Sequence, residues 1–201
     1  MDDIVRQALA KWPNVPHCYG WLALDARGGW YMRDDRVQAL GAFDSGVPGA
    51  KGSLLKHEKL VDFIHRNYDS DATGQWFFQN GPQRVYVELE VAPLIWRINR
   101  AADASPSPGL AVEAGRGATG FTVAAHTGEA AVPQRCVTDE HGRVYLDTDL
   151  GFGLVHTQDV GLAAEAVEQG KWVPVEVPAR ELPTRFGYVR SPATTHAMLH
   201  K

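Results

Sequence analysis

The sequence has few cysteines, no long apolar run and no excess of charge of one sign. Its two cysteines, Cys18 and Cys136, lie far apart, which excludes a CxxC redox pair and half of a zinc site. No segment approaches the ~18 consecutive apolar residues of a membrane span. Asp2 and Asp3 also stand where a signal peptide carries basic residues. We therefore expect a cytoplasmic protein that has no membrane partner.

The charge balance and the composition narrow the class of protein further. Lys and Arg total 20 against 24 Asp and Glu, which gives a net charge of -4 and no basic field to collect nucleic acid. Apolar residues make up 44% of the 201 positions, which is typical of a soluble globular protein with one or two domains. A chain of this length buries a core without disulfides or metals.

The local patterns predict hairpins and helices in one chain. Runs of strand-forming residues flank turns at 25–29, 80–82 and 139–142, which predicts three β-hairpins. Helical spacing of apolar residues predicts helices at 53–68 and 159–170. The sequence therefore predicts an α+β fold of mainly antiparallel strands with two packed helices.

A weak internal repeat runs through these elements. It rests on two sets of matched residues: Asp25, Gly28 and Tyr31 with Asp139, Gly142 and Tyr145, and Gly74-Gln75-Trp76 with Gly170-Lys171-Trp172. Each copy is predicted to be a hairpin, a helix and a Gly-x-Trp strand. We expect an N-terminal α+β half at 1–100, a flexible loop or linker at 101–118, and a related C-terminal α+β half at 119–201. Residues 178–201 have no clear period and receive no assignment.

Two motif-like segments do not complete a cofactor or metal site. Gly115–Gly120 spells GxGxxG, but Phe121-Thr122-Val123 favours a strand where dinucleotide binding requires a helix. His57-Glu58 begins like a zincin helix, but Val61 stands where the second histidine is required. We predict no cofactor and no metal.

Two catalytic arrangements compete with ordinary structural roles. Glu88 and Glu90 lie on one face of the predicted strand at a spacing that lets two carboxylates act as acid and base around a water. A hydrolase using this pair is one alternative, and a solvated sheet face is the other. Cys18 beside His17 suggests a thiol nucleophile or, alternatively, a buried cysteine that behaves as a small apolar residue.

We predict a binding site rather than a catalytic one, because no catalytic constellation is complete. His17 and Trp21 lie on an irregular entry into the first hairpin. Arg84 and Tyr86 point away from the core stripe of the second hairpin. These four residues are the candidate ligand-binding residues, unless a covering helix packs on the same face. The predicted function is a non-catalytic ligand- or protein-binding regulatory protein, with an unknown small molecule or protein as partner.

Several segments together resemble a proteobacterial family of uncharacterised proteins. The matching segments are residues 16–20, 25–30, 60–68, 76–87 and 90–93. They are more distantly similar to a second such family with the skeleton His-Cys-Gly, Asp-Gly-x-Trp, Leu-Val-x-x-Phe and Val-x-Val-Glu-x-Ala-Pro. This chain departs from that skeleton, since Tyr19 is inserted after Cys18 and Gly29 precedes Trp30. The resemblance implies an α+β fold of repeated motifs and, for the second family, a part in signal transduction; it carries over no catalytic residue.

Overall fold

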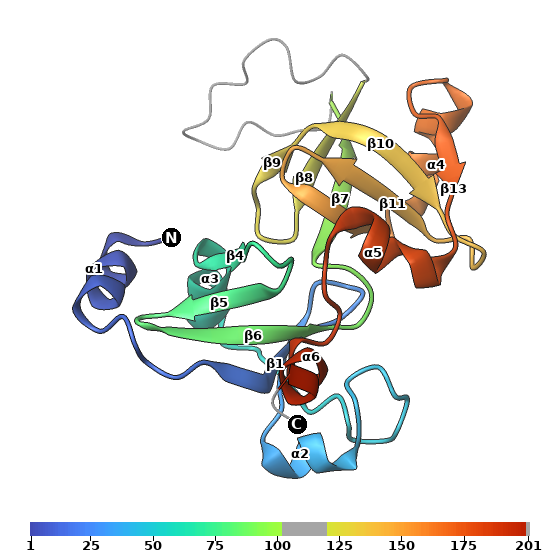
Figure 1. Ribbon diagram of the computed structural model, residues 1–201. Coiled ribbons are helices and arrows are strands. Elements are labelled where there is room, and N and C mark those ends of the chain that lie inside the picture. The colour runs from blue at the N-terminus through green and yellow to red at the C-terminus, as the bar shows by residue number, and fades with distance from the viewer. Residues whose placement is uncertain (102–119, 200–201) are drawn as a thin grey trace. The chain divides into compact units, whose positions relative to one another are not determined.

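The computed structural model describes residues 1–101 and 120–199, which divide into two compact units (Figure 1). Unit 1 contains residues 1–93 and the C-terminal segment from Gly187, and unit 2 contains the described residues between Leu94 and Phe186. Helices and sheets occur in both, so the α+β class is confirmed. The loop predicted at 101–118 lies, apart from Ala101, outside the described residues.

Unit 1 is built on a six-stranded sheet of order β3-β2-β1-β6-β5-β4. Its strands are β1 (Cys18–Leu24), β2 (Trp30–Met32), β3 (Ser53–Leu54), β4 (Tyr68–Ser70), β5 (Trp76–Asn80) and β6 (Gln83–Leu89). Its helices are α1 (Asp3–Lys11), α2 (Asp35–Leu40), α3 (Glu58–Arg66) and α6 (Pro192–Leu199). Neighbouring strands are antiparallel except for β1 and β6, which run parallel.

Helix α3 packs against strand β5 of this sheet through apolar residues that recur at helical spacing. The His57 ring accepts a hydrogen bond from the Leu60 backbone N–H and caps the first turn. Ile64 is buried, and Phe63 packs edge-on against Phe78 with ring centroids 5.4 Å apart. The helix expected at 53–68 is therefore present, with the extended residues of β3 before it.

The second half of strand β6, from Tyr86 to Leu89, is buried on both of its faces. Val87 and Leu89 lie in the core, as the alternating pattern predicts. Tyr86 and Glu88, which that pattern assigns to the opposite and uncovered face, are buried as well. The expected open face is absent at these positions because α6, from the segment without a clear period, packs on β1 and β6.

Unit 2 contains a seven-stranded sheet of order β13-β10-β11-β12-β7-β8-β9. The strands are β7 (Leu94–Arg100), β8 (Phe121–Ala125), β9 (Ala130–Ala131), β10 (Pro133–Thr138), β11 (Val144–Thr148), β12 (Gly151–Val155) and β13 (Pro174–Glu176). The helical segments are α4 (Val160–Glu168), a 3-10 turn (Ala179–Glu181) and α5 (Leu182–Phe186). The pairs β7–β12 and β10–β13 are parallel and the others antiparallel.

Asp159, at the N-terminus of α4, connects the start of that helix to β7 through hydrogen bonds. Asp159 is the N-cap residue, but its carboxylate makes no capping bond within the helix. Instead it accepts hydrogen bonds from the Ile98 N–H at 3.1 Å and from Nε of Arg97 at 2.6 Å. Ala163 and Ala166 then bury the inner side of α4. The buried carboxylate therefore joins a helix start to a strand.

The first part of the predicted repeat corresponds to one turn structure. Asp25 and Asp139 each accept backbone hydrogen bonds from the residues two and four positions later, and each turn contains a glycine at positive φ. Gly74 lies in a third turn of this type, which begins at Asp71. Gly170 instead follows α4, and Trp172 precedes β13, so this second part of the sequence match does not mark equivalent elements.

None of the described helices is long and apolar enough to cross a membrane.

Candidate functional site

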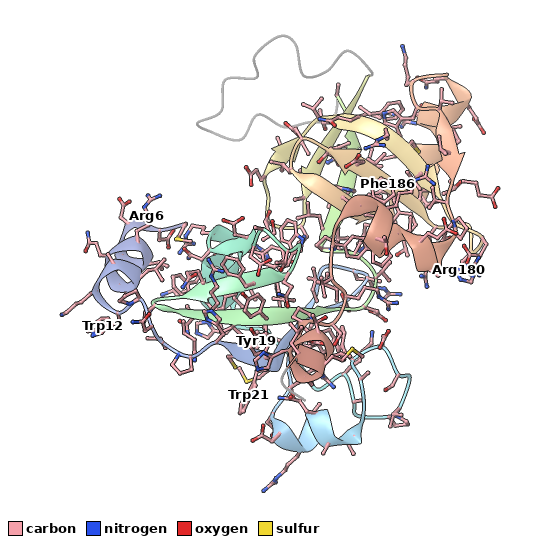
Figure 2. All side chains as sticks on the ribbon, in the orientation of Figure 1. Arg6, Trp12, Tyr19, Trp21, Arg180 and Phe186 are labelled. Carbon is pink, nitrogen blue, oxygen red and sulfur yellow. The ribbon has the colours of Figure 1, made fainter. Side chains whose placement is uncertain are left out.

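The candidate site begins with three parallel rings on the face of β1 and β6 that α6 covers. The Tyr19 ring lies 4.8 Å from the Tyr86 ring and 4.2 Å from the His196 ring, at interplanar angles of 5° and 7°. A ring has two faces, so Tyr86 and His196 occupy opposite faces of Tyr19. Figure 2 shows Tyr19 beside α6. We call these three residues the ring stack.

Arg84 lies next to the ring stack with its charge uncompensated by an ion pair. Its guanidinium carbon lies 4.3 Å from the centroid of the Phe77 ring, and its positive charge lies close enough to the Tyr86 hydroxyl to lower the pKa of that group. In the described part of the chain, no carboxylate forms an ion pair with Arg84. The aromatic contact fixes the plane of the guanidinium and leaves hydrogen-bond donors for another acceptor.

Asp71 is the nearest acidic partner of this group of residues. Its Oδ2 accepts a hydrogen bond from the Tyr86 hydroxyl at 3.0 Å, and its Oδ1 accepts from the backbone N–H groups of Thr73 and Gln75. Burial disfavours the ionised form, but these hydrogen bonds outweigh it and hold the pKa of Asp71 below its ordinary value. Asp71 is therefore ionised near neutral pH and orients the Tyr86 hydroxyl.

His17 contributes the most accessible ring of the group. It is exposed, and its ring meets the Tyr86 ring edge-on at 5.6 Å. Partial burial, and after it the positive charge of Arg84, lower the pKa of His17. The imidazole is therefore mostly neutral near pH 7 and can gain a proton when an anion lies beside it.

Three of the four predicted ligand-binding residues lie together, and the fourth is placed differently. The His17 ring contacts the Tyr86 ring, and the charge of Arg84 acts on the Tyr86 hydroxyl. Trp21 lies on β1 with 40% of its surface exposed, and it makes no ring contact with the other three. The register of β1 against β6 shifts between Cys18 and Leu22, which interrupts the regular alternation of side chains at Trp21.

Glu88 and Glu90 each have protein partners of their own. Glu88 accepts hydrogen bonds from the Ser191 hydroxyl at 2.5 Å and from the Ala193 N–H at 3.0 Å, so it caps the start of α6. Glu90 accepts from Nζ of Lys51 and from the Ala26 N–H. These contacts hold the two carboxylates in separate structural roles and give the hydrolase alternative no support.

The remaining catalytic candidate, Cys18, has no activated thiol. It is half-buried, and burial, followed by the charge of Asp35, raises the pKa of its thiol. Within residues 1–101 and 120–199, no cluster of His, Cys, Asp or Glu could hold a metal ion. Residues 115–119 of the GxGxxG segment lie outside the described residues.

The sequence reasoning missed three members of the site, namely Tyr19, Asp71 and His196. The Asp-x-x-Gly pattern of Asp71 and Gly74 matches the other two turns and is a signal that could have identified Asp71. Ser191 followed by Pro192 is a typical N-cap and first helical residue, and the Ser191 hydroxyl does accept a hydrogen bond from the Thr194 N–H. No local pattern indicates that this helix lies on β1.

These observations define an α+β protein of two units, with a polar and aromatic cluster on one sheet of unit 1. The chain belongs to the family described as "Protein of unknown function (DUF2946)", whose model matches residues 1–193. Among solved structures, it is similar to a DUF1285 family protein from Silicibacter pomeroyi DSS-3 at 13% identity and a TM-score of 0.48. That match covers 82% of this chain and 84% of the other. No functionally curated protein matches the chain.

Proposed function

We propose that the protein is a non-catalytic binding protein that recognises the anionic group of a small molecule through Arg84 and His17. The observation that carries this proposal is the partly exposed Arg84 guanidinium, which no carboxylate of the described chain neutralises. A guanidinium held over a ring presents donors in a fixed plane that matches a carboxylate or a phosphate. His17 adds a second nitrogen donor whose charge responds to the anion.

A regulatory role in the cytoplasm accompanies this proposal. It is supported by the likeness of the sequence to a family suggested to act in signal transduction. A binding role is also consistent with the hydrogen bonds of Glu88 and Glu90, because these bonds hold the two carboxylates in separate structural roles.

The test is a screen of small carboxylates and phosphates by ligand-observed NMR, followed by titration of each hit against variants. Arg84→Gln removes the charge, and we expect it to weaken binding by at least about tenfold. Arg6→Gln is the matched control, because Arg6 is an exposed arginine paired with Asp3 on α1. Arg84→Lys retains the charge and loses the planar fork, so it is expected to bind with intermediate affinity.

Two results would count against the proposal. One is that no anion binds the folded wild-type protein. The other is that Arg84→Gln and Arg6→Gln weaken binding equally, which would indicate general attraction to positive charge. Circular dichroism of each variant establishes that the fold is retained.

A further inference from the structure

Two opposite charges lie beside Tyr86 on the face of the unit 1 sheet that carries the ring stack. Arg84 precedes Tyr86 by two residues on β6, so both side chains lie on the same face of the strand. The Arg84 guanidinium carbon lies 4.3 Å from the centroid of the Phe77 ring, which is itself 5.8 Å from that of the Tyr86 ring. Asp71 reaches Tyr86 from the turn before β5, because its Oδ2 accepts the hydrogen bond of the Tyr86 hydroxyl.

These two charges act on one hydroxyl group and yet do not pair with each other. Burial raises the pKa of Tyr86, and of the two charges Arg84 lowers this pKa whereas Asp71 raises it, so both lie near the same oxygen. No nitrogen of Arg84 comes within 4.0 Å of a carboxylate oxygen of Asp71, and no other cation of the described residues forms an ion pair with Asp71. Both side chains are partly exposed. A cation and an anion are therefore each accessible to a charged group from solution.

Asp71 and Tyr86 have acceptors left for a cationic group. Oδ1 of Asp71 accepts from the Thr73 N–H, the Thr73 hydroxyl and the Gln75 N–H. Within the described chain Oδ2 accepts only from the Tyr86 hydroxyl, and a carboxylate oxygen has lone pairs for a further donor. The Tyr86 proton points to Asp71, so the lone pairs of its oxygen are directed elsewhere. An ammonium group has three donors and no acceptor, and it matches these two oxygens.

We infer that the ligand of the site is a free α-amino acid, whose carboxylate binds Arg84 and whose ammonium group binds Asp71 and the Tyr86 oxygen. The inference rests on the proposed anion site and names its ligand class. Arg84 alone would accept any anion, but the ionised Asp71 nearby repels a plain carboxylate. An ammonium group on the same ligand converts this repulsion into attraction. One carbon atom separates the two charges of an α-amino acid, which suits two protein charges that flank a single hydroxyl.

The experiment uses the full-length protein and three probes of similar size: L-alanine, propionate and ethylamine. Alanine carries both charges, propionate lacks the ammonium group and ethylamine lacks the carboxylate. We expect alanine to bind at least about tenfold more tightly than propionate at pH 7, which is the usual range for one hydrogen bond to a charged group. Ethylamine is expected to bind more weakly than alanine as well. Ligand-observed NMR titrations measure all three affinities.

Substitution of Asp71 separates its charge from its role in the turn. Asp71→Asn keeps a side-chain oxygen for the Thr73 and Gln75 N–H groups and removes the charge. We expect it to weaken alanine binding about tenfold and to leave propionate binding unchanged or stronger, because the repelling charge is gone. General damage to the fold would weaken both ligands alike.

Asp69→Asn is the matched control for this substitution. Asp69 pairs with Phe77 across β4 and β5, so it is an exposed carboxylate on the same face of the sheet. We expect Asp69→Asn to retain the preference for alanine over propionate. Arg84→Gln, in contrast, is expected to weaken both alanine and propionate binding.

The outcomes distinguish this inference from the proposed function. If alanine and propionate bind equally and both depend on Arg84, the anion site stands and the amino-acid ligand class is overturned. If Asp71→Asn weakens both ligands equally, or if Asp69→Asn abolishes the preference, the assignment of the ammonium group to Asp71 is overturned. If neither ligand binds, or if Arg84→Gln changes neither affinity, both the anion site and the inference fail.

Discussion

The Tyr86 hydroxyl donates a 3.0 Å hydrogen bond to Oδ2 of Asp71, which joins the central strand β6 to the turn between β4 and β5. In unit 2, the equivalent acceptor, Asp139, receives a 2.8 Å hydrogen bond from Tyr145, six positions later in the chain. The residue six positions after Asp71 is Phe77, which has no hydroxyl. Tyr86 pairs with Phe77 across the two strands and supplies the missing donor. The hydroxyl that bonds to Asp139 thus comes from the strand directly after the turn, whereas the hydroxyl that bonds to Asp71 comes from the next strand along the chain.

Replacement of Asp71 tests how much this turn stabilises unit 1. Asp71→Ala removes the acceptor of the Thr73 and Gln75 N–H groups and of the Tyr86 hydroxyl. We expect a loss of roughly 1–2 kcal/mol in the free energy of unfolding, measured by urea denaturation. Asp69→Ala is the control, because among the described residues that exposed carboxylate accepts a hydrogen bond only from the neighbouring Ser70 N–H. Equal losses would show that the turn has no special role.

The contribution of Asp71 to the stability of the fold is expected to be lost at low pH, because its pKa is lowered in the folded state. Its pKa in the folded state lies below 3.8, so ionisation stabilises the fold above that value. The stability difference between wild type and Asp71→Ala is therefore expected to be constant above about pH 5 and to shrink as the pH falls below about 3.8. A difference that grows on acidification contradicts this account.

A comparison of Gly74 with Gly81 separates the energetic cost of backbone strain from the cost of a close packing contact. Both have positive φ, but a Cβ at Gly74 would lie 2.1 Å from the Gly187 carbonyl oxygen, whereas at Gly81 the nearest atom is 4.0 Å away. Gly81→Ala is expected to cost about 1 kcal/mol, from φ alone. Gly74→Ala is expected to cost roughly 3 kcal/mol, because the C-terminal segment must also move. Thermal unfolding measures both, and similar midpoints would contradict the close contact.

Protonation of His17 is expected to strengthen anion binding at the proposed site. Burial and Arg84 lower its pKa below 6.5, so the free protein holds His17 mostly neutral at pH 7. Affinity should rise as the pH falls from about 7 to about 5.5, because an anion favours the charged imidazole. His17→Gln should remove most of this slope, as followed by titration calorimetry. His196 also faces this group, so His196→Gln is the control for the assignment.

The two cysteines are expected to differ in their reactivity. Cys136 is 3% exposed, and burial raises the pKa of its thiol to about 11. The Cys18 thiol is half-buried and also has a raised pKa. Iodoacetamide at about pH 8 should therefore label Cys18 slowly and Cys136 more slowly still, as counted by peptide mass spectrometry. Both should react alike after denaturation, and equal labelling of the native protein would contradict the burial of Cys136.

The sequence predicted those features that depend on neighbouring residues. The turns at Asp25 and Asp139, the helix with Ile64 on its inner face and the buried side chain of Val87 all follow from local patterns. It also placed Arg84 on the face opposite that core, beside Tyr86. These features depend on spacing along the chain, which the sequence contains directly.

What the sequence could not determine is which distant segments lie against one another. Period 2 in β6 shows that Tyr86 and Glu88 share a face, but only tertiary contacts place α6 over that face and bring His196 onto Tyr19. The parallel pairing of β1 with β6 is also decided by tertiary structure, because no short segment of the sequence indicates which distant strand will lie beside β1. The amino-acid pattern thus determined the elements and their inner faces, whereas the packing of the C-terminal segment decided whether the outer face is open or covered.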